Sequence, residues 1–230
     1  MLGIVALVLA AQAGATALLD HWWFSATTKA PVWRTQIVAK LELLAGAAVI
    51  TAAVLGTTVY LVVHVGKRVL APNNRAMRWY HARMGAGHRW LVIGVGVYTA
   101  WKILGAAPGA WKEWLLFLHG GDLGTSVPGI GGDLGGYLFD LPFERIVSQF
   151  VRQLLGFSLI VAFVGHSVSG SLRWSRTLKS RRAASAHIAV LAATLLVAQA
   201  VHSLVVARPS LVLNSSGGFV GAGYTETTVV

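Results

Sequence analysis

The chain of 230 residues has no cysteine and few charged residues. Without cysteine, disulfides, thiolate metal ligands and a cysteine nucleophile are all excluded. Charged residues make up 12% of the chain, whereas a soluble domain carries roughly 25%. With 55% hydrophobic residues and a mean hydropathy of +0.65, the composition predicts a membrane protein.

Long apolar runs are what the sequence does contain. Five of them approach the roughly 17–25 residues that a helix needs to cross the hydrocarbon core. They cover residues 2–19, 41–66, 90–107, 146–168 and 186–207. Because a backbone in lipid must satisfy its own hydrogen bonds, we expect all five to be helices. The first run has small residues like those before a signal-peptidase site, but it lacks a basic leader, which favours a retained helix.

The charges predict the direction in which the chain crosses the membrane. The two connections after the second and fourth runs hold eleven of the nineteen basic residues and no acid. By the positive-inside rule these connections are cytoplasmic, so the N-terminus lies in the cytosol and the C-terminus outside. Because positive charge in short loops between apolar helices has this topological cause, we expect contact with lipid headgroups and no nucleic-acid binding.

Residues 108–145 form a connection that is long for two neighbouring helices. In "AWKEWLLFL", residues 110–118, tryptophan and leucine recur at spacings of three and four, which predicts a short helix lying in the interface. Glycine and aspartate follow, and Pro142 is placed to start the next helix. The predicted fold is an all-α polytopic membrane bundle over residues 1–207, with this connection as a glycine-rich extracytoplasmic cap and 208–230 as an extracytoplasmic tail.

The cap sequence resembles the outer-loop motif of the UPF0182 family of bacterial membrane proteins. The family pattern F-G-x-x-D-P-x-F-x-x-D-x-G-F-Y-x-F-x-L-P-F is met at Gly124, Pro128, Asp133, Gly135, Tyr137, Phe139, Leu141, Pro142 and Phe143. A second block, "FVGAGYTE" with Gly223 and Tyr224, resembles the family's G-A-G-Y-T-D, and "DHWWF" at 20–24 resembles D-x-x-W-F. The chain departs from the pattern at Val127, Ile130, Gly136 and Glu226.

The resemblance implies a multi-pass protein of the bacterial cell (inner) membrane. The family continues into further helices and a large extracytoplasmic domain. The chain therefore looks like the family's N-terminal membrane part, either as a short homologue or as a fragment. An activity housed in the further domain is not implied for these residues.

Polar residues inside the apolar runs are the first functional candidates, because an unpaired charge in lipid is costly. Arg152 lies about one and a half turns into the fourth run, and Gln149 flanks it. Glu42 has a similar depth in the second run, and Lys102 lies in the third. The open interpretations are a structural Arg152–Glu42 pair, snorkelling of Arg152 to the interface, and a transport path lined by Arg152, Glu42 and Lys102.

Histidines and carboxylates raise the possibility of haem or a metal. His64 and His166 lie near the same ends of the second and fourth runs, as a bis-histidine haem or a quinone site requires. In the cap, His119, Asp122 and Asp133 offer ligands to a hard cation. Because capping, turns and headgroup contacts also use these residue types and no known ligand spacing is present, we expect no cofactor.

Motifs for hydrolytic, phosphate-binding, metalloprotease or nucleotide chemistry are absent from the sequence. We therefore expect no enzyme. Small residues four apart, Ala48, Ala52 and Gly56, allow helices to approach one another closely. The sequence predicts a non-enzymatic scaffold or accessory subunit of a bacterial envelope membrane complex, in contact with other membrane subunits. The alternatives are the transport component and the haem- or quinone-binding redox subunit.

Overall fold

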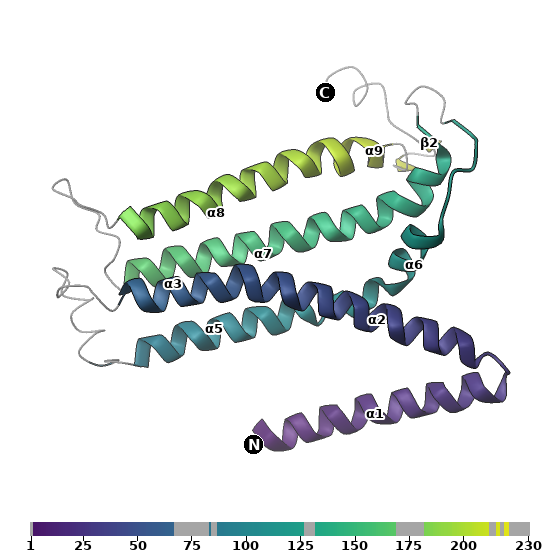
Figure 1. Ribbon diagram of the computed structural model, residues 1–230, viewed down its shortest axis with the longest axis horizontal. Helices are drawn as coiled ribbons and strands as arrows, with labels where there is room; N and C mark the ends of the chain where they lie inside the picture. The colour runs from purple at the N-terminus through teal and green to yellow at the C-terminus, as the bar shows by residue number, and fades with distance from the viewer. Residues whose placement is uncertain are drawn as a thin grey trace.

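The computed structural model describes residues 2–66, 83, 87–126, 132–168, 182–211, 215–216 and 219–220. Long helices lie side by side, and a short helix crosses one end of them (Figure 1). The helices are α1 Leu2–Ala26, α2 Ala30–Thr51, α3 Thr57–Gly66, α5 Gly87–Leu104, α6 Trp111–His119, α7 Leu141–Val168, α8 Arg182–Val201 and α9 Arg208–Ser210. We call the end with α6 the cap end, and the end where α3 and α7 finish the opposite end.

Single turns of other helix types join several of these helices. They are the π-helical turns η1 Ala52–Gly56, η3 Gly136–Asp140 and η4 His202–Ala207, and the 3₁₀ turn η2 Ala107–Ala110. The two-residue strands β1 Ser215–Ser216 and β2 Phe219–Val220 pair antiparallel in the predicted tail.

Four helical runs are long and apolar enough to cross a membrane, namely Ala30–His64, Arg89–His119, Gly136–Val168 and Arg182–Ser210. This confirms the predicted all-α polytopic bundle, although the first of the five predicted runs, 2–19, is not among the four. Far more of the large hydrophobic side chains on these runs are exposed than are buried. Such a surface suits helices surrounded by hydrocarbon and would be unfavourable in water.

The helices are longer than the apolar runs predicted. The second run was placed at 41–66, but α2 begins at Ala30, after a break at Thr28 with φ 59°. The fourth run was placed at 146–168 with Pro142 as its start, yet η3 already makes the chain helical from Gly136. Hydropathy marks the part of a helix that lies in hydrocarbon, and polar residues continue the helix beyond it.

Two small apolar clusters hold the bundle together around α7. One joins η1, α5 and α7 and consists of Leu55, Ile103, Leu154 and Val161. The other joins α7 to α8 and consists of Leu155, Ala162 and Leu191. Helix α7 therefore contacts both sides of the bundle, while α1 packs against α2 and lies apart from the rest (Figure 1).

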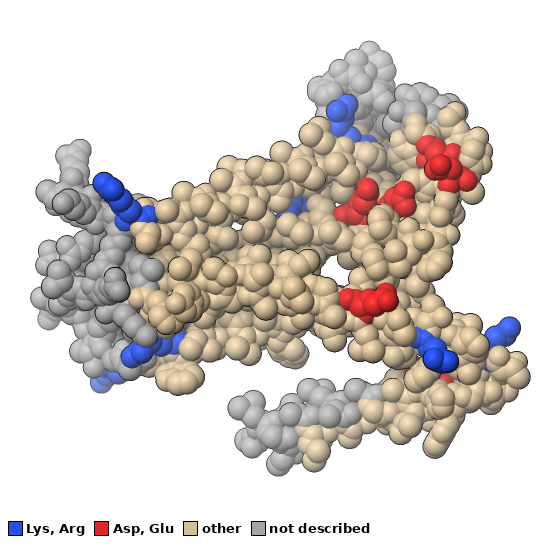
Figure 2. Space-filling view, in the orientation of Figure 1, with Lys and Arg blue, Asp and Glu red and all other residues tan. Residues whose placement is uncertain are grey.

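Acidic residues lie toward one end of the molecule, whereas Lys and Arg are found at both ends (Figure 2). Figure 2 shows Asp and Glu gathered at the cap end. The described acids are Asp20, Glu42, Glu113, Asp122, Asp133, Asp140 and Glu144. Most of the two predicted basic connections, 67–89 and 169–185, lies outside the described residues, but Arg83, Arg89 and Arg182 are described.

Candidate functional site

Helix α6 organises the cap end by binding both α2 and α7. The indole Nε1 of Trp114 donates a hydrogen bond to Oε2 of Glu42 at 3.0 Å. The rings of Trp114 and Phe117 each lie 5.0 Å from the ring of Phe143, the last aromatic of the cap motif. The short helix predicted at 110–118 is therefore present, and its apolar stripe joins two long helices.

Asp133 closes the loop that follows α6. Its Oδ1 accepts hydrogen bonds from the backbone N–H groups of Leu123 at 2.8 Å and Gly135 at 2.7 Å, and its Oδ2 accepts one from Thr125 at 3.1 Å. These backbone hydrogen bonds, that of Leu123 foremost, hold the pKa of Asp133 below its ordinary value of 3.8. The carboxylate is thus the anchor of a turn.

Two glycines of the cap motif, and Gly120 before it, meet specific backbone demands. Gly124 has φ +66°, a left-handed conformation that side chains disfavour. A Cβ on Gly135 would overlap the carbonyl oxygen of Gly121. At Gly120 a Cβ would lie 2.6 Å from that of Phe139. The motif glycines and Phe139 therefore encode the shape of the cap.

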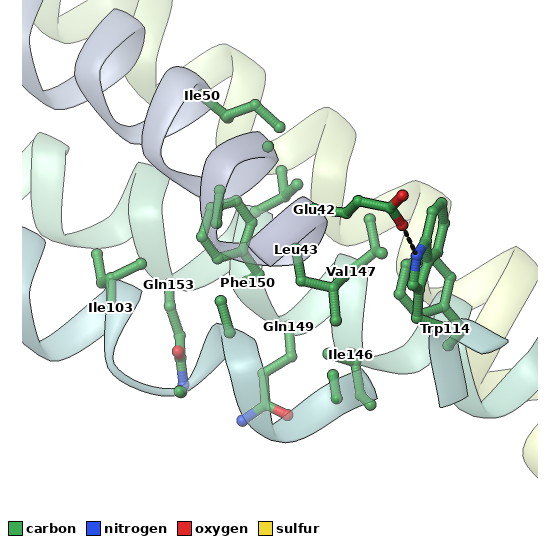
Figure 3. Close-up of a pocket in the computed structure, with 17 residues that line it drawn as sticks. Glu42, Leu43, Ile50, Ile103, Trp114, Ile146, Val147, Gln149, Phe150 and Gln153 are labelled. Atoms are coloured by element: carbon green, nitrogen blue, oxygen red, sulfur yellow. Dashed lines mark hydrogen bonds between the residues drawn. The ribbon is translucent and has the colours of Figure 1, made fainter. Parts of the chain in front are cut away.

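A cavity lies between α2, α5, α6 and α7 at the cap end (Figure 3). Its volume is about 350 Å³, within the roughly 300–1,000 Å³ of ligand pockets. Glu42 and Trp114 stand at one end and Ile103 at the other (Figure 3). The walls are mostly apolar and include the small residues Gly46, Ala47, Ala106, Ala107 and Ala110. Gln149 and Gln153 add two amides from α7.

Arg152 faces α8, on the other side of α7. Its Nη1 donates to Oε1 of Gln199 at 3.1 Å, and one turn nearer the cap Ser148 Oγ and His202 Nδ1 are hydrogen-bonded at 3.0 Å. The predicted Arg152–Glu42 pair is wrong, because Arg152 binds α8 and Glu42 binds α6. Sequence reasoning missed Gln199 and His202, whose only signal is polarity within an apolar run.

His166 pairs with a different histidine from the one predicted. Its Nε2 is hydrogen-bonded to Nδ1 of His187 at 3.2 Å, and its side chain is fully buried. His64 is exposed, stacks on the ring of Tyr60 at 4.0 Å and is hydrogen-bonded through Nδ1 to the Tyr60 carbonyl. The facing His64–His166 pair expected for haem or quinone is therefore not formed.

The remaining candidates do not converge on one site. Of Arg152, Glu42 and Lys102, only Glu42 lines the cap-end cavity, and Lys102 is exposed near the end of α5. His119 is hydrogen-bonded through Nδ1 to the Leu115 carbonyl. Within the part of the chain that the structure describes, no group of three or more His, Cys, Asp or Glu is placed to hold a metal ion.

Known proteins are similar to this chain in sequence. The sequence profile of the Uncharacterised protein family UPF0182 matches residues 1–230. The chain belongs to the UPF0182 family. UPF0182 proteins of Mycolicibacterium vanbaalenii, Mycolicibacterium gilvum and Mycobacterium tuberculosis are similar to it, with 32%, 33% and 30% identity over 237, 220 and 239 residues.

These matches cover 100%, 92% and 100% of this chain but only 23%, 22% and 23% of the three UPF0182 relatives. No solved structure matches the chain. Of the UPF0182 motif residues, Leu141 is buried at the start of α7 and Tyr137 lies beside Gly132. Pro128, Gly223 and Tyr224 lie outside the described residues.

Proposed function

We propose that this chain is a membrane-embedded, non-enzymatic scaffold that serves a bacterial envelope complex by presenting helix faces to partner membrane proteins. The observation that carries the proposal is an uncovered stripe on α5. Trp90, Val97 and Trp101, at i, i+7 and i+11, are 75%, 64% and 64% exposed. Gly94 lies on the same stripe, and nothing stands within 4 Å of the place where its Cβ would be.

A stripe of this kind suits a partner helix, because small residues let two backbones approach and neighbouring large side chains pack around the contact. The relatives support the same proposal. The chain spans about a quarter of their length, so the matching segment is one part of a longer protein in each of them.

The proposal is tested by native purification. The chain is extracted from the membrane of its own bacterium in mild detergent, and copurifying proteins are quantified by mass spectrometry. We expect a stoichiometric membrane partner, and Gly94→Leu should reduce its recovery about tenfold by filling the stripe. Val95→Leu is the matched control, since Val95 lies on α5 but off the stripe. A wild-type chain that runs as a lone monomer contradicts the proposal.

The proposed orientation places the cap end outside the bacterial inner membrane and the basic connections in the cytosol. The gathering of acids at the cap end and the positive charge of the two connections support it. Because the chain has no cysteine, single variants report cleanly. In intact cells a membrane-impermeant maleimide should label Ser126→Cys in the cap and spare Ser180→Cys. The reverse labelling pattern would show the opposite orientation.

A further inference from the structure

The cap-end cavity is elongated along the helix axes. Its lining extends from Glu42 to Ile50 on α2 and from Phe143 to Gln153 on α7. At 1.5 Å per residue, these stretches are about 12 Å and 15 Å long. Both belong to helical runs that are long and apolar enough to cross a membrane. A cavity of this shape lies parallel to lipid acyl chains, and about 350 Å³ suits one chain better than a bulky rigid ligand.

Small side chains keep the cavity open. A Cβ on Gly46 would meet nothing within 4 Å. An empty space of this kind deprives its lining of dispersion contacts. Water is a poor occupant, because it needs two to four polar partners and the walls are mostly apolar. An apolar occupant therefore stabilises the bundle.

Three polar side chains that line the cavity have hydrogen-bonding atoms without a partner among the described residues. Oε2 of Glu42 accepts the Trp114 indole N–H, while no described residue donates to Oε1. Gln149 and Gln153, one turn apart on α7, make no side-chain hydrogen bond to any other described residue. Polar groups in hydrocarbon need partners. A carboxylate attracts an ammonium, and an amide N–H suits an ester carbonyl.

Two lysines lie at the same junction of α2 and α6. The Nζ atoms of Lys40 and Lys112 lie 5.9 Å and 5.7 Å from the ring centroid of Trp111. Trp111 is one turn of α6 away from Trp114, which binds Glu42. Glu42 lines the cavity, whereas Lys40 and Lys112 lie outside its lining, each two residues along the chain from Glu42 or Trp114. This combination complements a headgroup that carries both an ammonium and a phosphate.

We propose that this cavity binds one amine-bearing phospholipid from the surrounding membrane. One acyl chain fills the space between α2 and α7. The headgroup ammonium binds Glu42, and the phosphate lies toward Lys40 and Lys112. The inference goes beyond the scaffold role and stands without it, because no partner protein is involved.

The test counts the lipid bound to the purified full-length chain. The chain in mild detergent is titrated with phosphatidylethanolamine or with phosphatidylglycerol, and bound lipid is measured by native mass spectrometry. Wild type should hold one phosphatidylethanolamine about tenfold more tightly than phosphatidylglycerol, because only the former offers a cationic donor that forms an ion pair with Glu42. Glu42→Gln keeps an acceptor for Trp114 but removes the charge, so the preference should fall to about parity.

Filling the cavity provides a second, independent readout. Gly46→Leu should lose the bound lipid while still folding, because the space beside Gly46 is open and leucine favours a helix. The matched controls are Glu113→Gln, an acid of α6 outside the cavity lining, and Gly94→Leu, an open glycine of α5. Both should keep the lipid.

Three outcomes overturn the proposal. They are equal retention of the two lipids by wild type, undiminished lipid retention by Gly46→Leu, and a copurified polypeptide bound in place of lipid. Failure of the scaffold role looks different, since a lone monomer that still holds one phosphatidylethanolamine leaves the lipid site intact. A chain that keeps its protein partners but binds no lipid contradicts the lipid site and leaves the scaffold role intact.

Discussion

The two ends of the bundle use glycine in opposite ways. At the opposite end α3 and α7 touch so closely that a Cβ on Gly165 would overlap Val62. At the cap end Gly46 faces open space, and a cavity of about 350 Å³ separates α2 from α7. The difference follows from α6, because Trp114 stands between Glu42 of α2 and Phe143 of α7 and holds the two helices apart. The opposite end is closed by direct contact between helices, and at the cap end Trp114 keeps α2 and α7 apart.

The largest effect is expected from breaking the close contact at the opposite end. Gly165→Leu forces a side chain into Val62, and overpacking of this kind costs about 1–3 kcal/mol of the free energy of unfolding. Thermal unfolding in detergent, followed by circular dichroism, measures it.

Gly156→Leu is the matched control on the same helix, since a Cβ at Gly156 meets nothing within 4 Å. Leucine also favours a helix over glycine by about 0.8–1 kcal/mol, so this variant should unfold at the wild-type temperature or above it. Equal losses in the two variants would show that the contact between α3 and α7 is not tight.

Sequence reasoning recovered what depends on one segment at a time. Hydropathy placed the helices, spacing placed α6, and the motif glycines and Asp133 indicated an ordered cap. The sequence does not show which neighbouring helix each side chain faces. Arg152 and Glu42 were paired because they share a depth, but depth does not say which neighbour a side chain faces. The cavity was missed for the same reason, because its small residues come from separate helices.

The next effect concerns the polar links between α7 and α8. Gln199→Leu removes the acceptor of Arg152 Nη1, while Nε of Arg152 is already buried without a partner among the described residues. A guanidinium that loses its acceptor should cost about 1–2 kcal/mol of the free energy of unfolding. Gln199→Glu keeps an acceptor and is the control. If both variants unfold at the wild-type temperature, Arg152 reaches water or headgroups instead.

A smaller and purely local effect is expected in the cap. The folded-state pKa of Asp133 is lowered, so its stabilisation of the loop is full above its ordinary value of 3.8 and is lost as the pH falls through the lowered pKa. Relative to its cutting of Asp133→Asn at the same pH, pepsin should therefore cut wild type between residues 120 and 135 increasingly as the pH is lowered from about 5 to about 2. Asp133→Asn should be cut readily at both, with Asp122→Asn as the control. A pH-independent pattern in wild type contradicts the role of the carboxylate.

The smallest effect is expected from removing a buried hydroxyl of α7, between the cap end and the opposite end. Ser158 is fully buried on α7, and its Oγ has no partner among the described residues. Ser158→Ala removes an unpaired polar group at nearly constant volume, so the free energy of unfolding should stay the same or rise by up to about 1 kcal/mol. Ser148→Ala, nearer the cap, breaks a hydrogen bond to His202 and should cost about 0.6 kcal/mol.

Thermal unfolding of the two serine variants in the same detergent decides between close packing and polar linkage. Ser158→Ala should unfold at the higher temperature of the two, because helix contact rather than hydrogen bonding holds α7 at that level. If it unfolds at the lower temperature, the Ser158 hydroxyl contributes a bond to the folded state, in addition to the hydrogen bond of His166 to His187 that links α7 to α8 at the opposite end.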